Sequence, residues 1–370
     1  MKKIIVLSII TLITSSSAIA QKYFFYVAAE SDDKVELIEF DSDKKEANLI
    51  QSIEVGTFPA ENEGPHGMTV SPDGKHWFVT IAHGMPYGQV WKFETGTNKL
   101  LGKTDLGLFP ASMEISETTG FLYIVNFNLH GEMEPSTVSV VDPETMDLIE
   151  NIPVGIMPHG SRISTDGNFQ YHVSMMTDEL LEIDTQSLEV SRRLMLTESN
   201  MAMNHDGHDM KMEKGMKMDM HKTIIKPTWA DPHPISNYVY VAGNGSHEIL
   251  EVDTDSWKVS RRFDAGSGNA PYNLEVSGDG SVLVASYKSG AATGVWDLES
   301  GKELAKIKNS RKVSHGVSIS PDSRYAFISV EGIGGEPGSV DVIDLKNLEL
   351  VDTVETGKQA GGIYFWKVES

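Results

Sequence analysis

The stretch Gly64-Pro-His-Gly-Met-Thr-Val-Ser-Pro-Asp-Gly74 decides the fold, because versions of it recur along the chain. Five further copies follow: Phe109-Pro-Ala-Ser-Met-Glu-Ile-Ser116, Met157-Pro-His-Gly-Ser-Arg-Ile-Ser-Thr-Asp-Gly167, Pro227-Thr-Trp-Ala-Asp-Pro-His233, Ala270-Pro-Tyr-Asn-Leu-Glu-Val-Ser-Gly-Asp-Gly280 and Ser314-His-Gly-Val-Ser-Ile-Ser-Pro-Asp322. The copy at Pro227 is the most degenerate. They repeat about every 40 to 50 residues, which is the period of the blades of a β-propeller.

Each copy opens a set of four predicted strands. The copy itself predicts a short strand that ends in a turn, and a second apolar strand follows, as at His76–Ile81 and Tyr325–Ser329. A third strand ends in Asp, as at Thr137–Asp142, Leu180–Asp184, Ile249–Asp253 and Ser339–Asp344, and a fourth follows a turn, as at Leu188–Leu194. Four antiparallel strands make one blade.

The number of blades follows from the positions of the copies. Six complete blades begin near residues 64, 108, 156, 226, 267 and 311. Residues 23–63 supply three more strands without an opening strand, and Gln359–Trp366 supplies an opening strand without successors. Pairing the two ends closes the ring and hides both sheet edges, which would otherwise template aggregation. We therefore predict an all-β, seven-bladed propeller.

The repeats resemble those of the bacterial YVTN-type propellers, the YncE-like group. The resemblance rests on the Pro-Asp-Gly turns, on Tyr240-Val-Ala-Gly243 and on the strand Val340–Asp344, and it covers essentially all of residues 21–370. It implies the propeller fold. It implies no single activity, because that group is a scaffold used by lactonases, ligand binders and redox proteins.

The N-terminus predicts export. Lys2 and Lys3 precede the apolar run Ile4–Ile13, and Ala18 and Ala20 provide a signal peptidase site before Gln21. The apolar run is too short to span a bilayer as a helix. Residues 1–20 are thus an expected signal peptide, and residues 21–370 form a single propeller domain that works in the periplasm or after secretion.

The amino-acid composition limits the classes of molecule that the chain is expected to bind. The chain has no Cys, so it forms no disulfide and offers no thiolate to a metal ion. Its net charge of −22 disfavours binding to nucleic acid and to anionic lipid. The same charge favours solubility and attracts cations. We expect a monomer that binds no nucleic acid and does not insert into a membrane.

The strand order brings three kinds of position to one rim of the ring: the start of each first strand, the loop after each second strand and the connections between blades. The first-strand positions are His66, Ala111, His159, Thr228, Tyr272, His315 and Ala360. The loops after the second strands add His83, Met85, His130, Met133, Met175, Met176 and His247.

Histidine is frequent at this rim. Neutral imidazole binds copper, zinc, iron and nickel, so His66, His159 and His315 are predicted metal ligands, with His83 beside them. In the alternative interpretation, these histidines polarise a water-filled channel mouth or cap the turns.

Residues 201–222, the Met/His segment, connect the third and fourth blades. Its candidate ligands are Met201, Met203, His205, His208, Met210, Met212, Met216, Met218, Met220 and His221. The segment has no Leu, Ile, Val, Phe, Tyr or Trp, so it is not predicted to form a helix or strand packed in the core. Thioethers prefer Cu(I) and imidazoles accept Cu(I) and Cu(II), which makes copper the best match; zinc, nickel and a sacrificial antioxidant role stay open.

Three functions remain. The first is an exported protein that handles copper and delivers it either to the His-lined rim or to a periplasmic protein partner. It uses every unusual feature of the sequence. The second is a propeller enzyme, either a copper oxidoreductase or a lactonase-like hydrolase, although no Gly-x-Ser-x-Gly motif supports hydrolysis. The third is a non-catalytic propeller that binds a protein or a small ligand.

Overall fold

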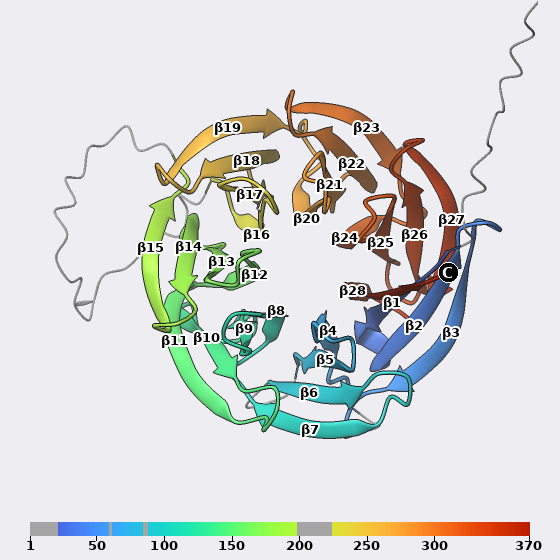
Figure 1. The fold of residues 1–370 in the computed structure, drawn as a ribbon, viewed down its shortest axis with the longest axis horizontal. Helices are drawn as coiled ribbons and strands as arrows, with labels where there is room; N and C mark the ends of the chain where they lie inside the picture. Colours follow the sequence, from blue (N-terminus) through green and yellow to red (C-terminus); the bar gives the residue numbers. More distant parts are fainter. Residues whose placement is uncertain (1–20, 59–60, 84–87, 198–223) are drawn as a thin grey trace, which may run out of the picture.

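The computed structural model describes residues 21–58, 61–83, 88–197 and 224–370. It confirms a seven-bladed propeller, with seven four-stranded antiparallel sheets arranged in a ring (Figure 1). We call the region at the centre of the ring, between the inner strands, the channel. The described part of the chain has no helix that is long and apolar enough to cross a bilayer.

Six blades are continuous in sequence and run from the inner to the outer strand. Blades 1 and 2 consist of β4 (Pro65–Val70), β5 (His76–Ile81), β6 (Gln89–Glu94), β7 (Leu100–Asp105), β8 (Pro110–Ile115), β9 (Leu122–Asn126), β10 (Pro135–Val141) and β11 (Leu148–Ile156). Blades 3 and 4 consist of β12 (Pro158–Ile163), β13 (Phe169–Ser174), β14 (Glu179–Asp184), β15 (Glu189–Met195), β16 (Pro227–Pro232), β17 (Tyr238–Gly243), β18 (Glu248–Asp253) and β19 (Lys258–Asp264). Blades 5 and 6 consist of β20 (Pro271–Val276), β21 (Val282–Tyr287), β22 (Ala292–Asp297), β23 (Lys302–Lys308), β24 (Val313–Ile319), β25 (Tyr325–Glu331), β26 (Gly338–Asp344) and β27 (Glu349–Thr356).

Blade 7 joins the two ends of the chain, as predicted. Its sheet has the order β28 (Ala360–Glu369), β1 (Lys22–Ala29), β2 (Lys34–Asp41) and β3 (Glu46–Glu54), and a short 3-10 helix, η1 (Glu30–Asp32), follows β1. β1 and β28 pair antiparallel, with Tyr26 opposite Tyr364. This pairing removes two free sheet edges at once.

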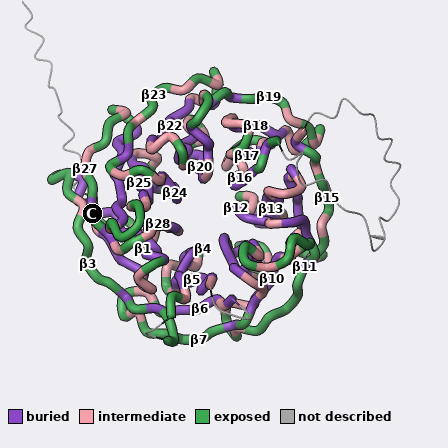
Figure 2. Tube along the Cα trace, turned by 180° about the vertical axis from the view of Figure 1, so that it is seen from behind, coloured by how far each residue is buried: buried purple, intermediate pink, exposed green. Residues whose placement is uncertain are grey.

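The core lies between blades. Phe25 stacks on Phe327 across blades 7 and 6, with ring centroids 4.3 Å apart, and both side chains are fully buried. Burial decreases from the inner to the outer strands, which carry most of the exposed residues (Figure 2). A buried side chain of this size contributes about 1.5 to 3 kcal/mol, so packing between blades holds the ring together.

The inner strands begin in a common way that aims one side chain into the channel. In six of the seven blades the residue before the strand has a left-handed φ, as at Gly64 (59°) and Phe109 (50°), and β24 is the exception. A β-bulge follows the first paired residue, as between Pro65 and Met68, or in β24 the second, between Ser314 and Val317. A bulge re-aims a side chain, and the re-aimed residue here is the predicted first-strand position.

Candidate functional site

The channel ring is the set of residues that follow, in each inner strand, the last paired residue before the β-bulge. Pro65 pairs with Ile81 and Pro158 with Ser174, so the next residues are His66 and His159. The full ring is His66, Ala111, His159, Thr228, Tyr272, His315 and Gly361. The prediction of Ala360 was wrong by one residue, because Ala360 pairs with Ala29 and so occupies the place of Pro65.

Glycine after two of these histidines lets the blades approach closely. A Cβ on Gly67 would lie 1.9 Å from the carbonyl oxygen of Ala111 in the next blade, and one on Gly160 would lie 2.4 Å from that of Thr228. Only glycine fits such a contact. The His-Gly pairs in the repeated stretch therefore set the narrow bore at this level of the ring.

The structure brings three of the predicted ligands together. The ring centroids of His66 and His315 are 5.6 Å apart, and those of His66 and His159 are 6.2 Å apart. All three side chains are buried. We call His66, His159 and His315 the His triad.

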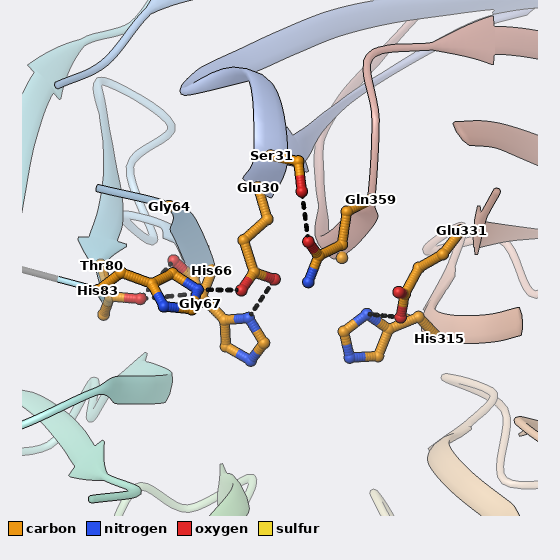
Figure 3. Close-up of polar contacts among 12 residues, drawn as sticks. Glu30, Ser31, Gly64, His66, Gly67, Thr80, His83, His315, Glu331 and Gln359 are labelled. Carbon is orange, nitrogen blue, oxygen red and sulfur yellow. Dashed lines mark hydrogen bonds and ion pairs between the residues drawn. The ribbon is translucent and has the colours of Figure 1, made fainter. Parts of the chain in front are cut away.

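The Nδ1 atom of each triad imidazole faces an oxygen. His66 Nδ1 lies 3.0 Å from Glu30 Oε2, and His159 Nδ1 lies 2.8 Å from the carbonyl oxygen of Thr228. His315 Nδ1 lies 3.2 Å from Glu331 Oε1, although the angle is outside hydrogen-bond geometry (Figure 3). Histidines that bind metals characteristically donate their other ring N–H to such acceptors.

Glu30 is the residue that the sequence analysis missed. Its side chain is 3 % exposed, and its two oxygens contact His66 and His83 Nε2, the latter at 2.6 Å (Figure 3). Burial alone would raise the pKa of Glu30, but the charge of His66 and the hydrogen bonds from His66 and His83 outweigh it and lower the pKa. Glu30 therefore stays ionised, as a fixed negative charge beside the His triad.

The remaining side of the site carries Tyr272, Lys288 and Glu331. Tyr272 Oη lies 3.0 Å from His159 Nε2, and Lys288 Nζ lies 3.9 Å from the centre of the Tyr272 ring. Lys288 Nζ is also 3.7 Å from Glu331 Oε1. Lys288 follows β21 and Glu331 ends β25, so both occupy the loop position that Glu30 occupies in blade 7.

The space enclosed by the triad is small. A cavity of about 30 Å³ is lined by the His triad and also by Met68 and Met113. That volume is about the share of one water molecule in the liquid, whereas organic ligands occupy cavities of about 300 to 1,000 Å³. In the described part of the chain, no three His, Asp or Glu side chains are already arranged to hold a metal ion.

Burial keeps two members of the triad neutral. It lowers the pKa of His159 to about 3, with the charge of His66 acting in the same direction. It also lowers the pKa of His315 well below the usual range, helped by the charge of Lys288. Neutral imidazole is the form that binds metals.

The other predicted ligands lie elsewhere. His83 follows β5 at the same rim and contacts Glu30 rather than the triad. The Met/His segment, with Met201, Met203, His205, His208, Met210, Met212, Met216, Met218, Met220 and His221, lies outside the described residues. Its described flanks meet at Asp178, which receives a hydrogen bond from Lys226 N at 2.8 Å, while the Asp178 carbonyl accepts one from Leu196 N.

A second polar layer, not predicted from the sequence, lines the opposite end of the channel. Its cavity of about 290 Å³ is lined by Glu114, Arg162, Asp231, Glu275 and Tyr364, three residues beyond the channel ring on their strands. Burial raises the pKa of Glu275 to about 7, despite the charge of Arg162. Each of the three acids accepts a backbone N–H from another blade.

Comparison with known proteins supports the fold. Similar solved structures include the hydrazine synthase of Kuenenia stuttgartiensis, with 18% identity, a TM-score of 0.64 and coverage of 84% of this chain and 93% of that one. A functionally unknown protein from Desulfotomaculum acetoxidans is 16% identical, with a TM-score of 0.68 and coverage of 93% of this chain and 98% of that one. No protein-family model and no curated protein sequence matches the chain. At these identities the similarity establishes the propeller fold and no activity.

Proposed function

We propose that the chain is an exported propeller that binds a copper ion at the mouth of its channel. The observation that carries the proposal is the His triad around a cavity of about 30 Å³ that Met68 and Met113 also line. Imidazole binds copper as Cu(I) and as Cu(II), and the thioethers of Met68 and Met113 pack in the apolar cores between the blades, so the imidazoles are the proposed ligands. The cavity admits an ion and has no room for an organic substrate.

The geometry is consistent with a shared ion. A metal ion about 2.0 to 2.1 Å from two imidazole nitrogens places the ring centroids about 5 to 6 Å apart. The observed separation of His66 and His315, 5.6 Å, lies in this range, and that of His66 and His159, 6.2 Å, is slightly wider. The rings would turn to converge on one point, and the Tyr272 hydroxyl would release His159 Nε2.

The electrostatics also favour a cation. Glu30 is ionised, and the depressed pKa values of His159 and His315 leave these two imidazoles without a competing proton at neutral pH. Two cationic side chains oppose this preference: Arg162 also lines the cavity, and Lys288 lies near it with its charge faced by Glu331 at 3.7 Å.

The Met/His segment and the N-terminus complete the proposal. We infer from composition that residues 201–222 collect copper, and Asp178 holds both described flanks of the segment in the loop after β13, at the rim of the His triad. The signal-like residues 1–20 support export. The Pro-Asp-Gly turns and Tyr240–Gly243 support assignment to the YVTN-type group.

The test is to load residues 21–370 with Cu(I), Cu(II) and Zn(II) separately and to measure bound metal per chain. The parent is compared with a chain lacking residues 201–222 and with a His66→Ala, His159→Ala, His315→Ala variant. His233→Ala is the matched control, because His233 lies outside both sites and binds backbone at Gly280 and Ile235.

We expect copper to persist without the segment and to fall when the triad is replaced. Copper that disappears with the segment alone would make the protein a collector without a channel site. If neither form binds copper, both metal sites are wrong and a non-catalytic binding propeller becomes the better account.

A further inference from the structure

Two histidines at the rim approach each other outside the triad. His83 Nδ1 lies 3.1 Å from His130 Nε2, and their ring centroids are 5.2 Å apart. His83 follows β5 and His130 follows β9, so they come from adjacent blades. We call them the rim pair.

The separation of the two nitrogens suits a shared metal ion. With bonds of about 2.0 to 2.1 Å, two imidazole nitrogens on one ion are about 3.3 Å apart in a tetrahedral site and about 2.9 Å apart at right angles. The observed 3.1 Å lies between these values.

The second nitrogen of His83 is already held in the way that metal sites require. His83 Nε2 lies 2.6 Å from Glu30 Oε1, a carboxylate oxygen that can only accept, so in the neutral imidazole the N–H is on Nε2 and the lone pair is on Nδ1, facing His130. A carboxylate behind a histidine orients the ring and raises its basicity as a ligand. Phe109 packs against both rings of the rim pair. The centroid of its ring lies 4.8 Å from that of His83 and 5.4 Å from that of His130.

The rim pair is accessible, unlike the triad. The His83 side chain is 28 % exposed and His130 is exposed, while Glu30 behind them is buried. The charge on Glu30 therefore faces two imidazole groups, one open to solvent and one inside the channel.

We propose that His83 and His130 form a second transition-metal site, open to solvent, that takes a divalent ion such as Cu(II) and shares Glu30 with the His triad. The identity of the metal rests on the proposed function, but the site does not need the triad to be occupied. An ion at the rim pair is one carboxylate away from His66, which makes the rim pair the outer step of a route into the channel.

The experiment titrates Cu(II) into the metal-free full-length mature chain and measures bound equivalents together with the nitrogen splitting in the electron paramagnetic resonance spectrum. The variants are His130→Ala, His83→Ala and the triple alanine variant of the triad. His247→Ala is the control, because His247 follows β17 at an equivalent loop and accepts a hydrogen bond from Ala270 N. His130 is exposed, so its replacement leaves folding unchanged, which a thermal melt verifies.

We expect His130→Ala to lose one equivalent and the corresponding two-nitrogen signal, and the triple variant to keep that signal. If the rim signal survives while the triad never binds copper, the proposed channel site fails and the rim site stands. If His83→Ala and His130→Ala both bind Cu(II) as the parent does, the contact is only a hydrogen bond between imidazoles and the rim site is overturned.

Discussion

At the scale of single residues, Glu30 organises the site. It is a buried carboxylate that faces His66 and His83, and it takes up the loop position that Lys288 and Glu331 take up in blades 5 and 6. Sequence reasoning could have found it as a charged residue directly after the buried strand Tyr23–Ala29. It was missed because blade 7 is split between the chain ends, which obscured its alignment with the other blades.

Replacing Glu30 by Gln should weaken copper binding at the channel by about 10- to 100-fold, because outer partners of ligating histidines have effects of that size. Gln cannot accept hydrogen bonds from two imidazoles through two oxygens. Competition with a chelator of known affinity measures the change. The control is Glu36→Gln, since Glu36 is also buried in blade 7 but contacts Ser52 and Gly357 N instead of histidine.

The His159 pKa predicts a pH dependence of stability. The ordinary value of 6.5 falls to about 3 in the folded chain, so the unfolded state binds the proton first and stability is lost as pH falls below 6.5. At pH 5 the loss from this residue is about 2 kcal/mol. In urea unfolding of the metal-free chain, His159→Gln should remove this loss of about 2 kcal/mol between neutral pH and pH 5. Replacement of the exposed His130 should leave the pH dependence of stability unchanged. Equal slopes for His159→Gln and the parent would contradict this assignment.

At the scale of elements, the inner strands carry two polar layers. A bulge aims the channel ring at one end, and acids three residues further along line the other end. The repeat predicted the first layer because Pro and His stand at fixed places in it. It did not predict the second, because Glu114, Arg162, Asp231 and Glu275 differ in type and only the register shows that they meet.

The second polar layer predicts the opposite pH dependence of stability. The pKa of Glu275 rises from 4.5 to about 7, so its contribution to stability is present below 4.5 and is lost as pH rises to 7. At pH 8 the ionised group costs about 3 kcal/mol. Glu275→Gln should recover up to that amount at pH 8 and little at pH 4, because Gln can still accept the Ile319 N–H. Denaturant unfolding at pH 4 and pH 8 measures this gain, with the exposed Glu117→Gln variant as control. A Glu275→Gln variant that is less stable than the parent at pH 8 would contradict the prediction.

At the scale of the whole molecule, the ring depends on the β1–β28 pairing. The strands of residues 23–63 and the opening strand at 359–366 were predicted to share a blade, and they do. Turn chemistry and alternation made the blades predictable because they are local. Distances between the histidines depend on the width of the ring at its centre, which the close contact at Gly67 sets. This width could not be predicted from the sequence.

Deleting residues 359–370 should abolish cooperative unfolding, because it exposes the edge of β1 and leaves β4 and β24 without the neighbour that β28 provides. Circular dichroism melts measure this directly. Removing residues 1–20 is the control and should leave the transition intact, since β1 starts at Lys22. A truncated chain that still melts in one sharp transition would contradict the closure.

The most direct test of the central claim is an anomalous difference map, collected at the copper absorption edge, from crystals of the copper-loaded mature chain. The account predicts a peak in the channel within bonding distance of the Nε2 atoms of His66, His159 and His315. A loaded crystal with no peak inside the channel would contradict it, even if copper were found elsewhere on the molecule.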